Sequence, residues 1–179
     1  GQDGSADIGS GMAKPELVFN VGHSGAVNSV CYSPDGKYLV SASGVNDHTI
    51  KLWELATGKV VKTLTGHTGG INSVTYSLDG AYLASGSADD GTVKIWEVRT
   101  WNCVKTLKAN GGGALCYSPD GAYLANVSAY GSIIELWEVE TGKCVKTLRH
   151  TNRVTSVAYS PDGKYLASCS LDKTVKLWE

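Results

Sequence analysis

Apolar and polar residues alternate along the chain in short runs, with the period of two that is typical of half-buried β-strands. Near the end of the chain, Val154–Glu179 holds three such runs, VTSVAYS, KYLASCS and TVKLWE, separated by the turn sequences SPDG and LDK. In SPDG, proline presets φ and glycine accepts a left-handed conformation, which favours a tight hairpin. This stretch is therefore predicted to form three antiparallel strands.

The same unit occurs four times. Each copy contains YSxDGxYL and ends its third run with Trp-Glu, and the four tryptophans Trp53, Trp96, Trp137 and Trp178 lie roughly 40 residues apart. A fourth run follows in three units, at Lys59–Thr65, Asn102–Lys108 and Lys143–Arg149, and one isolated run, Glu16–Val21, precedes them all. We therefore predict four-stranded meanders at residues 22–65, 66–108 and 109–149, and a last one at 150–179 that residues 17–21 complete.

One turn differs between the units. Gly58 and Gly142 stand before the fourth run of the first and third units, whereas the second unit has Trp101 there. We expect an altered turn at this place and a partly exposed indole ring.

Composition narrows the class of protein. The 179 residues carry a formal net charge of −1, which argues against nucleic acid and anionic membrane surfaces as partners. The sequence has no apolar run near 18 residues, so no membrane span is predicted. The five cysteines form no CxxC pair, which favours reduced thiols, a cytoplasmic location and buried cysteine side chains.

Residues 1–11 are polar and glycine-rich and are interpreted as an expression remnant or disordered lead, which leaves 12–179 as the folded unit.

These motifs resemble WD40 repeats. The resemblance rests on the Gly-His pairs at 22–23 and 66–67, the SPDG turns, Ser168–Trp178 (SCSLDKTVKLW) and the recurring Trp-Glu, where the family has Trp-Asp. It covers Leu17–Glu179 and implies an all-β fold, a β-propeller with four WD40-type, four-stranded blades per chain.

In that family a His–Ser/Thr–Asp–Trp network ties each blade, and a buried tryptophan N–H does require an acceptor. The resemblance places this network at His23, Ser41 or Ser43, Asp47 and Trp53; at His67, Ser85 or Ser87, Asp90 and Trp96; and at His150, Ser168 or Ser170, Asp172 and Trp178. The third unit has Ala109-Asn110 for Gly-His and Gly131 for Asp, so that only Ser128 and Trp137 remain. We expect the third blade to be the least stable.

Recurring His, Ser and Asp also raise the possibility of a hydrolase triad. Such a triad needs an exposed nucleophile, an oxyanion site and a pocket, whereas this trio recurs in most units beside a tryptophan, as a structural feature would. His48 has no second ligand at metal spacing, and no helix follows the glycine-rich turns to bind a phosphate. The protein is predicted not to be an enzyme and to have no metal and no cofactor.

The resemblance implies protein or peptide binding on the propeller face where the loops after second and fourth strands converge. Tyr130 and Arg153 rank first as contacts, because interface hot spots favour Tyr and Arg; the alternative is that these are ordinary loop residues. The matching positions are Asn28, Asn46, Asn72, Asp89, Tyr130, Arg153, Thr155 and Leu171.

The number of blades raises the question of closure, since WD40 propellers usually have seven or eight blades and four is half of eight. We predict a homodimer in which two chains join head to tail into one eight-bladed ring. In this ring Leu17, Val18, Phe19 and Val21 of each copy would complete the other's last blade, beside Val175 and Leu177. The alternatives are a four-bladed monomer, a fragment of a longer propeller, or a minimal half-propeller whose only activity is self-assembly.

Overall fold

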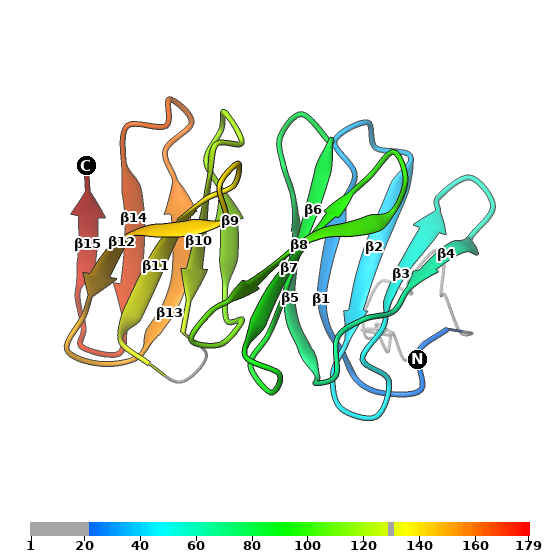
Figure 1. Cartoon of the computed structure of the whole chain (residues 1–179), viewed down its shortest axis with the longest axis horizontal. Coiled ribbons are helices and arrows are strands. Elements are labelled where there is room, and N and C mark those ends of the chain that lie inside the picture. The colour runs from blue at the N-terminus through cyan, green and yellow to red at the C-terminus, as the bar shows by residue number, and fades with distance from the viewer. Residues whose placement is uncertain (1–21, 129–130) are drawn as a thin grey trace, which may run out of the picture.

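The protein is described from a computed structural model, which places residues 22–128 and 131–179. Four antiparallel sheets, here called blades 1 to 4 in chain order, stand side by side in a row (Figure 1). The all-β prediction is thus confirmed, and the described residues contain no helix long and apolar enough to cross a membrane.

Blades 1 to 3 have four strands each, and the described part of blade 4 has three. Blade 1 consists of β1 (Val27–Tyr32), β2 (Tyr38–Ser43), β3 (Ile50–Glu54) and β4 (Lys59–Leu64). Blade 2 consists of β5 (Ile71–Tyr76), β6 (Tyr82–Ser87), β7 (Thr92–Glu97) and β8 (Asn102–Lys108). Blade 3 consists of β9 (Leu115–Tyr117), β10 (Tyr123–Val127), β11 (Ile133–Glu138) and β12 (Lys143–Arg149), and blade 4 of β13 (Val154–Tyr159), β14 (Leu166–Ser170) and β15 (Val175–Trp178).

The first hairpin of every blade is closed by the residues of the SPDG turn. In blade 1 the Ser33 hydroxyl donates to Asp35 Oδ1 at 2.6 Å, and Gly36 adopts a left-handed φ of 69°. Blade 2 has leucine in place of the proline, and its Ser77 hydroxyl still donates to Asp79 Oδ1 at 2.6 Å. The serine and aspartate therefore fix this turn, and the proline is dispensable.

The turn at Trp101 is not altered, which corrects the expectation from the sequence. The backbone N–H of Trp101 donates to the Glu97 carbonyl at 2.6 Å. The backbone N–H groups of Gly58 and Gly142 donate in the same way to the Glu54 and Glu138 carbonyls, at 2.8 Å. Trp101 also keeps a positive φ of 57°, a conformation that bulky residues rarely adopt. Its indole is half-buried, as predicted, and packs against the core between blades 1 and 2.

The core lies in three layers between neighbouring blades, and the same strand positions build each layer. Between blades 1 and 2, side chains of β2, β3 and β4 meet side chains of β5, β6 and β7. The residues of this layer include Val40, Ala42, Ile50, Leu52 and Leu64 from blade 1, and Ile71, Val74, Leu83 and Trp96 from blade 2. Blades 2 and 3 thus bury one face against the preceding blade and the other against the following blade, whereas blades 1 and 4 each bury one face in these layers.

Blades 1 and 4 lie at opposite ends of the row (Figure 1), so that the described blades form an open array and not a closed four-bladed ring. On the outer face of blade 1, Val27 and Val30 are 51% and 58% exposed, and on blade 4 Val175 and Leu177 are 76% and 64% exposed. The strand predicted to complete blade 4, at residues 17–21, lies outside the described residues.

The cysteines are more accessible than predicted. Cys103 and Cys144 are exposed because they lie on β8 and β12, the outermost strands of their blades. Cys31 and Cys116 lie on inner strands and are partly buried, and this burial raises the pKa of each thiol to about 12. The prediction of buried thiols is therefore wrong for the outer-strand pair.

The interblade layers predict a sharp contrast between two leucines of blade 2. Leu83 is fully buried, whereas Leu78 is 69% exposed. We expect Leu83→Ala to lower the free energy of unfolding by about 2–5 kcal/mol, because it leaves a cavity, and Leu78→Ala to change it by less than about 0.5 kcal/mol. Urea denaturation of both variants measures the difference, and equal losses would contradict the assignment of the core.

Candidate functional site

A chain of hydrogen bonds links the four network residues of blade 2. The Trp96 indole N–H donates to Ser85 Oγ at 2.8 Å, and Ser85 Oγ lies 2.7 Å from His67 Nε2. His67 Nδ1 lies 2.7 Å from Asp90 Oδ2, and the other carboxylate oxygen accepts from the Thr92 hydroxyl at 2.6 Å. The chain connects the third strand, the second strand, the loop before the first strand and the second turn.

Blades 1 and 4 repeat this arrangement with nearly the same distances. In blade 1 the Trp53 indole nitrogen and His23 Nε2 each lie 2.7 Å from Ser41 Oγ, and His23 Nδ1 lies 2.7 Å from Asp47 Oδ2. In blade 4 the corresponding residues are His150, Ser168, Asp172 and Trp178, with 2.8 Å at each of the three contacts. The first serine of each predicted pair is thus the member that contacts the histidine and tryptophan.

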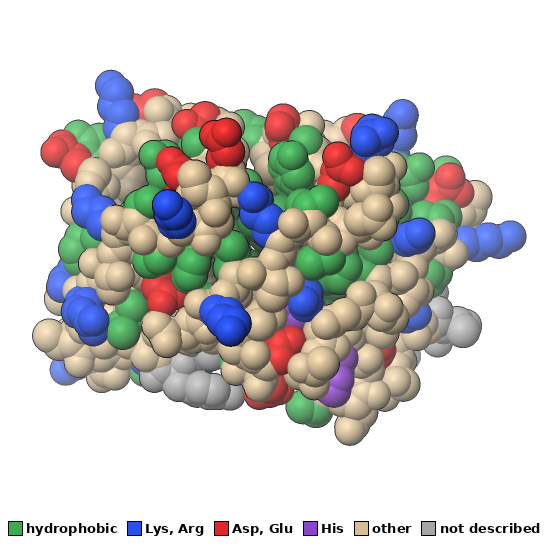
Figure 2. Space-filling view, viewed as in Figure 1, with side chains coloured by type: hydrophobic (Ala, Val, Ile, Leu, Met, Phe, Trp, Pro, Cys, Tyr) green, Lys and Arg blue, Asp and Glu red, His purple; other side chains and the backbone are tan. Residues whose placement is uncertain are grey.

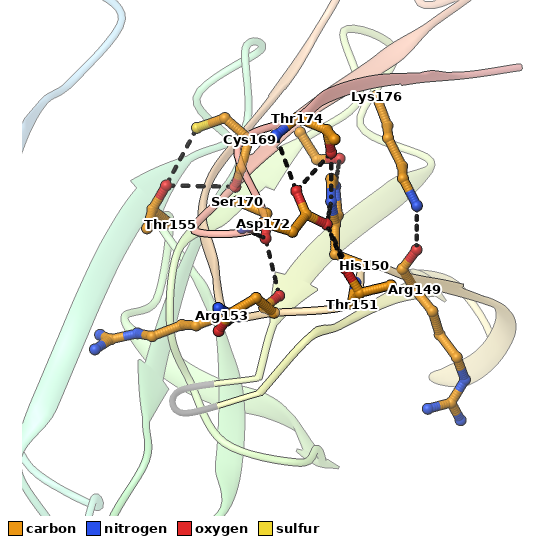
Figure 3. Close-up of polar contacts among 12 residues, drawn as sticks. Arg149, His150, Thr151, Arg153, Thr155, Cys169, Ser170, Asp172, Thr174 and Lys176 are labelled. Atoms are coloured by element: carbon orange, nitrogen blue, oxygen red, sulfur yellow. Dashed lines mark hydrogen bonds and ion pairs between the residues drawn. The ribbon is translucent and has the colours of Figure 1, made fainter.

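The second serine of each pair forms a hydrogen bond with a backbone group of a neighbouring loop. Ser43 donates to the Ala26 carbonyl at 3.1 Å, and Ser170 donates to the Asn152 carbonyl at 2.9 Å. The Ser87 hydroxyl accepts from the Asp90 N–H at 3.3 Å. Figure 3 shows the blade 4 loop, where Asp172 faces His150 and Thr174 while the Arg153 side chain points away.

In blade 2 the electrostatics of the network favour a neutral His67 beside an ionised Asp90. Burial lowers the pKa of His67, although the neighbouring Asp90 acts in the opposite direction. Burial raises the pKa of Asp90, but hydrogen bonds from Thr92 and His67 outweigh it, so that this pKa lies below its usual value. A neutral imidazole can donate from Nδ1 to the aspartate and accept from the serine at Nε2.

The serines of these networks are poorly placed for catalysis. Ser41, Ser85 and Ser168 are 4%, 0% and 2% exposed, and each already contacts a tryptophan N–H. A hydrolase needs its nucleophile exposed to substrate beside an oxyanion site. The geometry therefore supports a role in holding the blade together.

Blade 3 contains a different polar cluster, which reasoning from the sequence missed. Asn110 occupies the place of the histidine, and its Nδ2 donates to Glu135 Oε1 at 2.6 Å. Asn126 occupies the place of the network serine, and its Nδ2 donates to Glu135 Oε2 at 3.2 Å. Glu135 is only 6% exposed, so that a buried carboxylate between two amides replaces the His–Ser–Asp chain.

Ser128 does not replace the missing serine, which corrects the assignment from the sequence. The Ser128 hydroxyl donates to the Ile133 carbonyl at 3.2 Å. The Trp137 indole nitrogen and Asn126 Oδ1 are both buried without a hydrogen-bond partner in the described residues. The sequence did contain a signal for this cluster, because Glu135 occupies a third-strand position that is lysine in the other units, at Lys51, Lys94 and Lys176.

The predicted binding face combines loop residues with residues at the start of first strands, and several of its polar side chains form hydrogen bonds with nearby backbone groups. Asn28 Nδ2 donates to the Ile71 carbonyl at 2.9 Å and so bridges blades 1 and 2. Asn72 Oδ1 accepts from the Ala88 N–H at 2.9 Å, and Asp89 Oδ2 accepts from the Gly70 N–H at 3.2 Å. Asn46 is exposed, with a left-handed φ of 78°.

In blade 4 the same face brings Arg153 and Leu171 together. The Leu171 N–H donates to the Arg153 carbonyl at 2.9 Å, and the Leu171 side chain is 57% exposed. The Thr155 hydroxyl donates to the Cys169 carbonyl at 3.3 Å. Tyr130 lies outside the described residues, and a binding role for all of these positions stays a prediction.

The described part of the chain shows no set of side chains that could bind a metal ion. No group of three or more His, Cys, Asp or Glu side chains is arranged there to hold an ion. His48, the extra histidine of the first long turn, is partly buried and has a left-handed φ of 57°.

Comparison with known families identifies the repeats. The family model described as "WD domain, G-beta repeat" matches residues 14–54, 58–97 and 142–179, more than half of the chain. Residues 98–141, which include β9, β10 and β11, lie outside the matched spans. The unmatched region thus contains most of the blade whose network differs.

Similar proteins match over about one blade. An uncharacterized WD repeat-containing protein of Synechocystis, sll1491, is 50% identical over 44 residues, which are 25% of this chain and 12% of that protein. The ribosome biogenesis protein BOP1 homologs of Drosophila mojavensis and Drosophila melanogaster are 51% and 49% identical over 48 and 49 residues, 27% of this chain and 6% of each relative. The chain therefore covers only a small share of these relatives.

The lowered pKa values of Asp90 and His67 predict a loss of stability in acid. The unfolded chain binds more protons at both groups, so the free energy of unfolding should fall as pH drops from about 7 to about 3. Asp90→Asn should make this pH dependence shallower. Ser87→Ala removes a non-titrating hydroxyl from the same turn and should keep the wild-type slope; urea midpoints at several pH values test the comparison.

The altered cluster predicts that blade 3 opens more readily than blade 2. A buried polar group without a partner costs about 1–3 kcal/mol, and Trp137 and Asn126 each contain one within the described residues. Amide hydrogen exchange in β10 and β11 should be at least about tenfold faster than in β6 and β7. Slower exchange in blade 3 than in blade 2 would overturn this prediction.

Proposed function

The chain belongs to the WD40 family, and from this premise we propose that it is a non-catalytic scaffold for protein–protein interaction whose partner is a second copy of itself. Two copies join head to tail, so that their blades form one eight-bladed ring. Residues 17–21 of each copy complete the last blade of the other by strand exchange.

The observation that carries this proposal is the match between the two end faces of the row. The exposed residues of blade 1, Val27 and Val30, stand at the strand positions that Ile71 and Val74 occupy in blade 2, where both are buried. The exposed residues of blade 4, Val175 and Leu177, stand at the positions of the buried blade 1 residues Ile50 and Leu52. Each end face thus presents one half of the layer found between neighbouring blades.

Exposed apolar surface of this kind favours association, because its burial releases water. The two end faces differ from each other, so that a contact between two copies is heterologous. Such a contact closes when the rotation that it imposes completes a ring. Four blades per copy and two copies give the eight blades of a common WD40 ring.

The edge of blade 4 supports strand exchange. In blades 1 to 3 an outer strand pairs with the third strand, whereas β15 pairs only with β14 among the described residues. An unpaired edge strand readily accepts another strand through its backbone groups. A strand from residues 17–21 of a second copy would supply these hydrogen bonds and cover the outer side of Trp178, which is partly exposed.

The predicted binding face is a candidate site for a further partner. We propose that Arg153, Thr155 and Leu171, with the asparagines of blades 1 and 2, contact a protein or peptide there. The absence of CxxC pairs and the five free thiols favour a reducing compartment, and we propose a cytoplasmic location. A half-propeller with self-assembly as its only activity is the second candidate, since the matched end faces favour it equally.

The solution mass tests the assembly. The chain has a mass of 18.8 kDa, and light scattering should give about twice this value. Removal of residues 1–21 should weaken the dimer, because the exchanged strand is lost. A particle of 18.8 kDa at micromolar concentration would contradict the proposal, and a larger open polymer would contradict ring closure.

A cross-link tests the predicted register. Ala42 and Ile71 lie in the buried layer between blades 1 and 2, and the equivalent residues Val127 and Val154 lie in the layer between blades 3 and 4. Cys169 holds the position of Ala42 in blade 4, and Val27 holds the position of Ile71 in blade 1. Under mild oxidation, Val27→Cys should therefore form a disulfide-linked dimer with Cys169 of the second copy.

Two controls separate this cross-link from random oxidation. Val61→Cys places an equally exposed thiol on β4, away from the end faces, and should give little covalent dimer. With the exposed Cys103 and Cys144 replaced by serine in every sample, the double variant Val27→Cys, Cys169→Ser should also remain unlinked. Equal dimer yields from Val27→Cys and Val61→Cys would refute the head-to-tail register.

A further inference from the structure

A cleft of about 490 Å³ lies between blades 1 and 2, away from both end faces. Its walls combine three aromatic rings, Tyr38, Tyr76 and Trp101, with the carboxylates of Asp35 and Asp79. Leu52, Val61 and Val98 add apolar surface. This combination of ring faces and carboxylates occurs in a cleft to which the assembly proposed above assigns no role.

The neighbouring cleft between blades 2 and 3 shows what is special here. That cleft has the equivalent residues Asp79, Tyr82 and Asp120, but Gly142 takes the place of Trp101. In the cleft between blades 2 and 3, the Lys105 ammonium group donates a hydrogen bond to the Glu140 carbonyl at 2.6 Å. Lys62, the equivalent lysine of blade 1, makes no such bond within residues 22–128 and 131–179, and Trp101 stands on the opposite wall.

Trp101 occupies this wall against its conformational preference. Its φ of 57° is the conformation that glycine adopts in the equivalent turns of blades 1 and 3. Strained backbone conformations of this kind cluster at sites where the side chain takes part in binding or catalysis. No hydrogen bond within the described residues holds the Trp101 indole N–H.

The two carboxylates are ionised and each keeps one oxygen available. Asp35 Oδ1 accepts from the Ser33 hydroxyl and the Lys37 N–H, and Asp79 Oδ1 accepts from the Ser77 hydroxyl and the Ala81 N–H. These hydrogen bonds lower the pKa of both groups. Each Oδ2 has no hydrogen bond within the described residues, so that it can accept one from a ligand.

We propose that this cleft binds a cationic side chain, arginine or lysine, of a partner peptide, with the cation between the Trp101 ring and the Asp35 and Asp79 carboxylates. A cation over a tryptophan face gains the strongest of the cation–π attractions. The carboxylates add charge-assisted hydrogen bonds. An anionic ligand fits poorly, because Lys62 is the single cation among the described residues that line the cleft, and the carboxylates of Asp35 and Asp79 oppose it.

Blocked amino acids test this proposal on the full chain. Nα-acetyl-arginine methylamide and its lysine counterpart should shift the indole N–H resonance of Trp101, which is assigned by its absence from Trp101→Gly. The citrulline counterpart is neutral and nearly isosteric with arginine, and should bind at least about fivefold more weakly. Tighter arginine binding indicates guanidinium stacking, and tighter lysine binding indicates an ammonium ligand; either result supports a cation site.

Three variants of the cleft should move the affinity in different directions. Trp101→Gly installs the residue of the equivalent turns and should weaken binding about fivefold or more. Asp79→Asn keeps the turn acceptor and should weaken binding about threefold, whereas Lys62→Gln should tighten it by a similar factor.

Three results would overturn the proposal. These are equal affinity for the citrulline probe, unchanged binding by Trp101→Gly, and no shift of the Trp101 resonance with either cationic probe. Asp79→Asn and Lys62→Gln provide the decision if Trp101→Gly does not fold. None of these outcomes depends on dimer formation, so that the cleft and the assembly are tested separately.

Discussion

The packing of each blade against the next is the interaction on which the rest of this structure depends. Val40 and Ile50 of blade 1 are buried in one layer with Val74 and Leu83 of blade 2, and the same positions meet in the two later layers. Burial of apolar side chains is the main favourable term in folding. A sheet with two apolar faces needs a neighbour on both sides, so that any open row exposes one face at each end. The exposed valines of blades 1 and 4 are a direct consequence of this constraint.

The polar networks are secondary to this packing, since their task is to let a tryptophan be buried. A ring such as Trp96 contributes a large apolar surface but carries an N–H that needs a partner. Ser85 provides the acceptor, and His67 and Asp90 hold the serine in place. Blade 3 shows that the ring can be buried without this chain, because Trp137 is 8% exposed although its N–H has no partner in the described residues. Packing therefore outweighs the hydrogen bond, at the cost of an unsatisfied group.

Much of this architecture was predictable from the sequence, because the period of two, the turn residues and the tryptophan spacing all repeat. The networks of blades 1, 2 and 4 followed from the resemblance to WD40 repeats, which left a choice between two serines in each blade. The Asn110–Glu135–Asn126 cluster was missed because its residues match no motif and become adjacent only across strands. Exposure of Cys103 and Cys144 was missed because alternation predicts which face a residue occupies, and not whether another element covers an outer strand.

Repetition also makes the departures of single units informative. A residue that replaces its repeat equivalent without changing the backbone shows that the fold did not require the replacement. Trp101 is such a case, since the turn keeps the hydrogen bond and positive φ of its glycine equivalents. A bulky residue in that conformation is disfavoured by about 1 kcal/mol or more. Its indole packs on the core between blades 1 and 2, but Leu52 and Tyr38 already lie there, and blades 2 and 3 pack closely with glycine at the corresponding place. A cation bound in the cleft that Trp101 lines, beside two carboxylates that the turns keep ionised, would offset this strain.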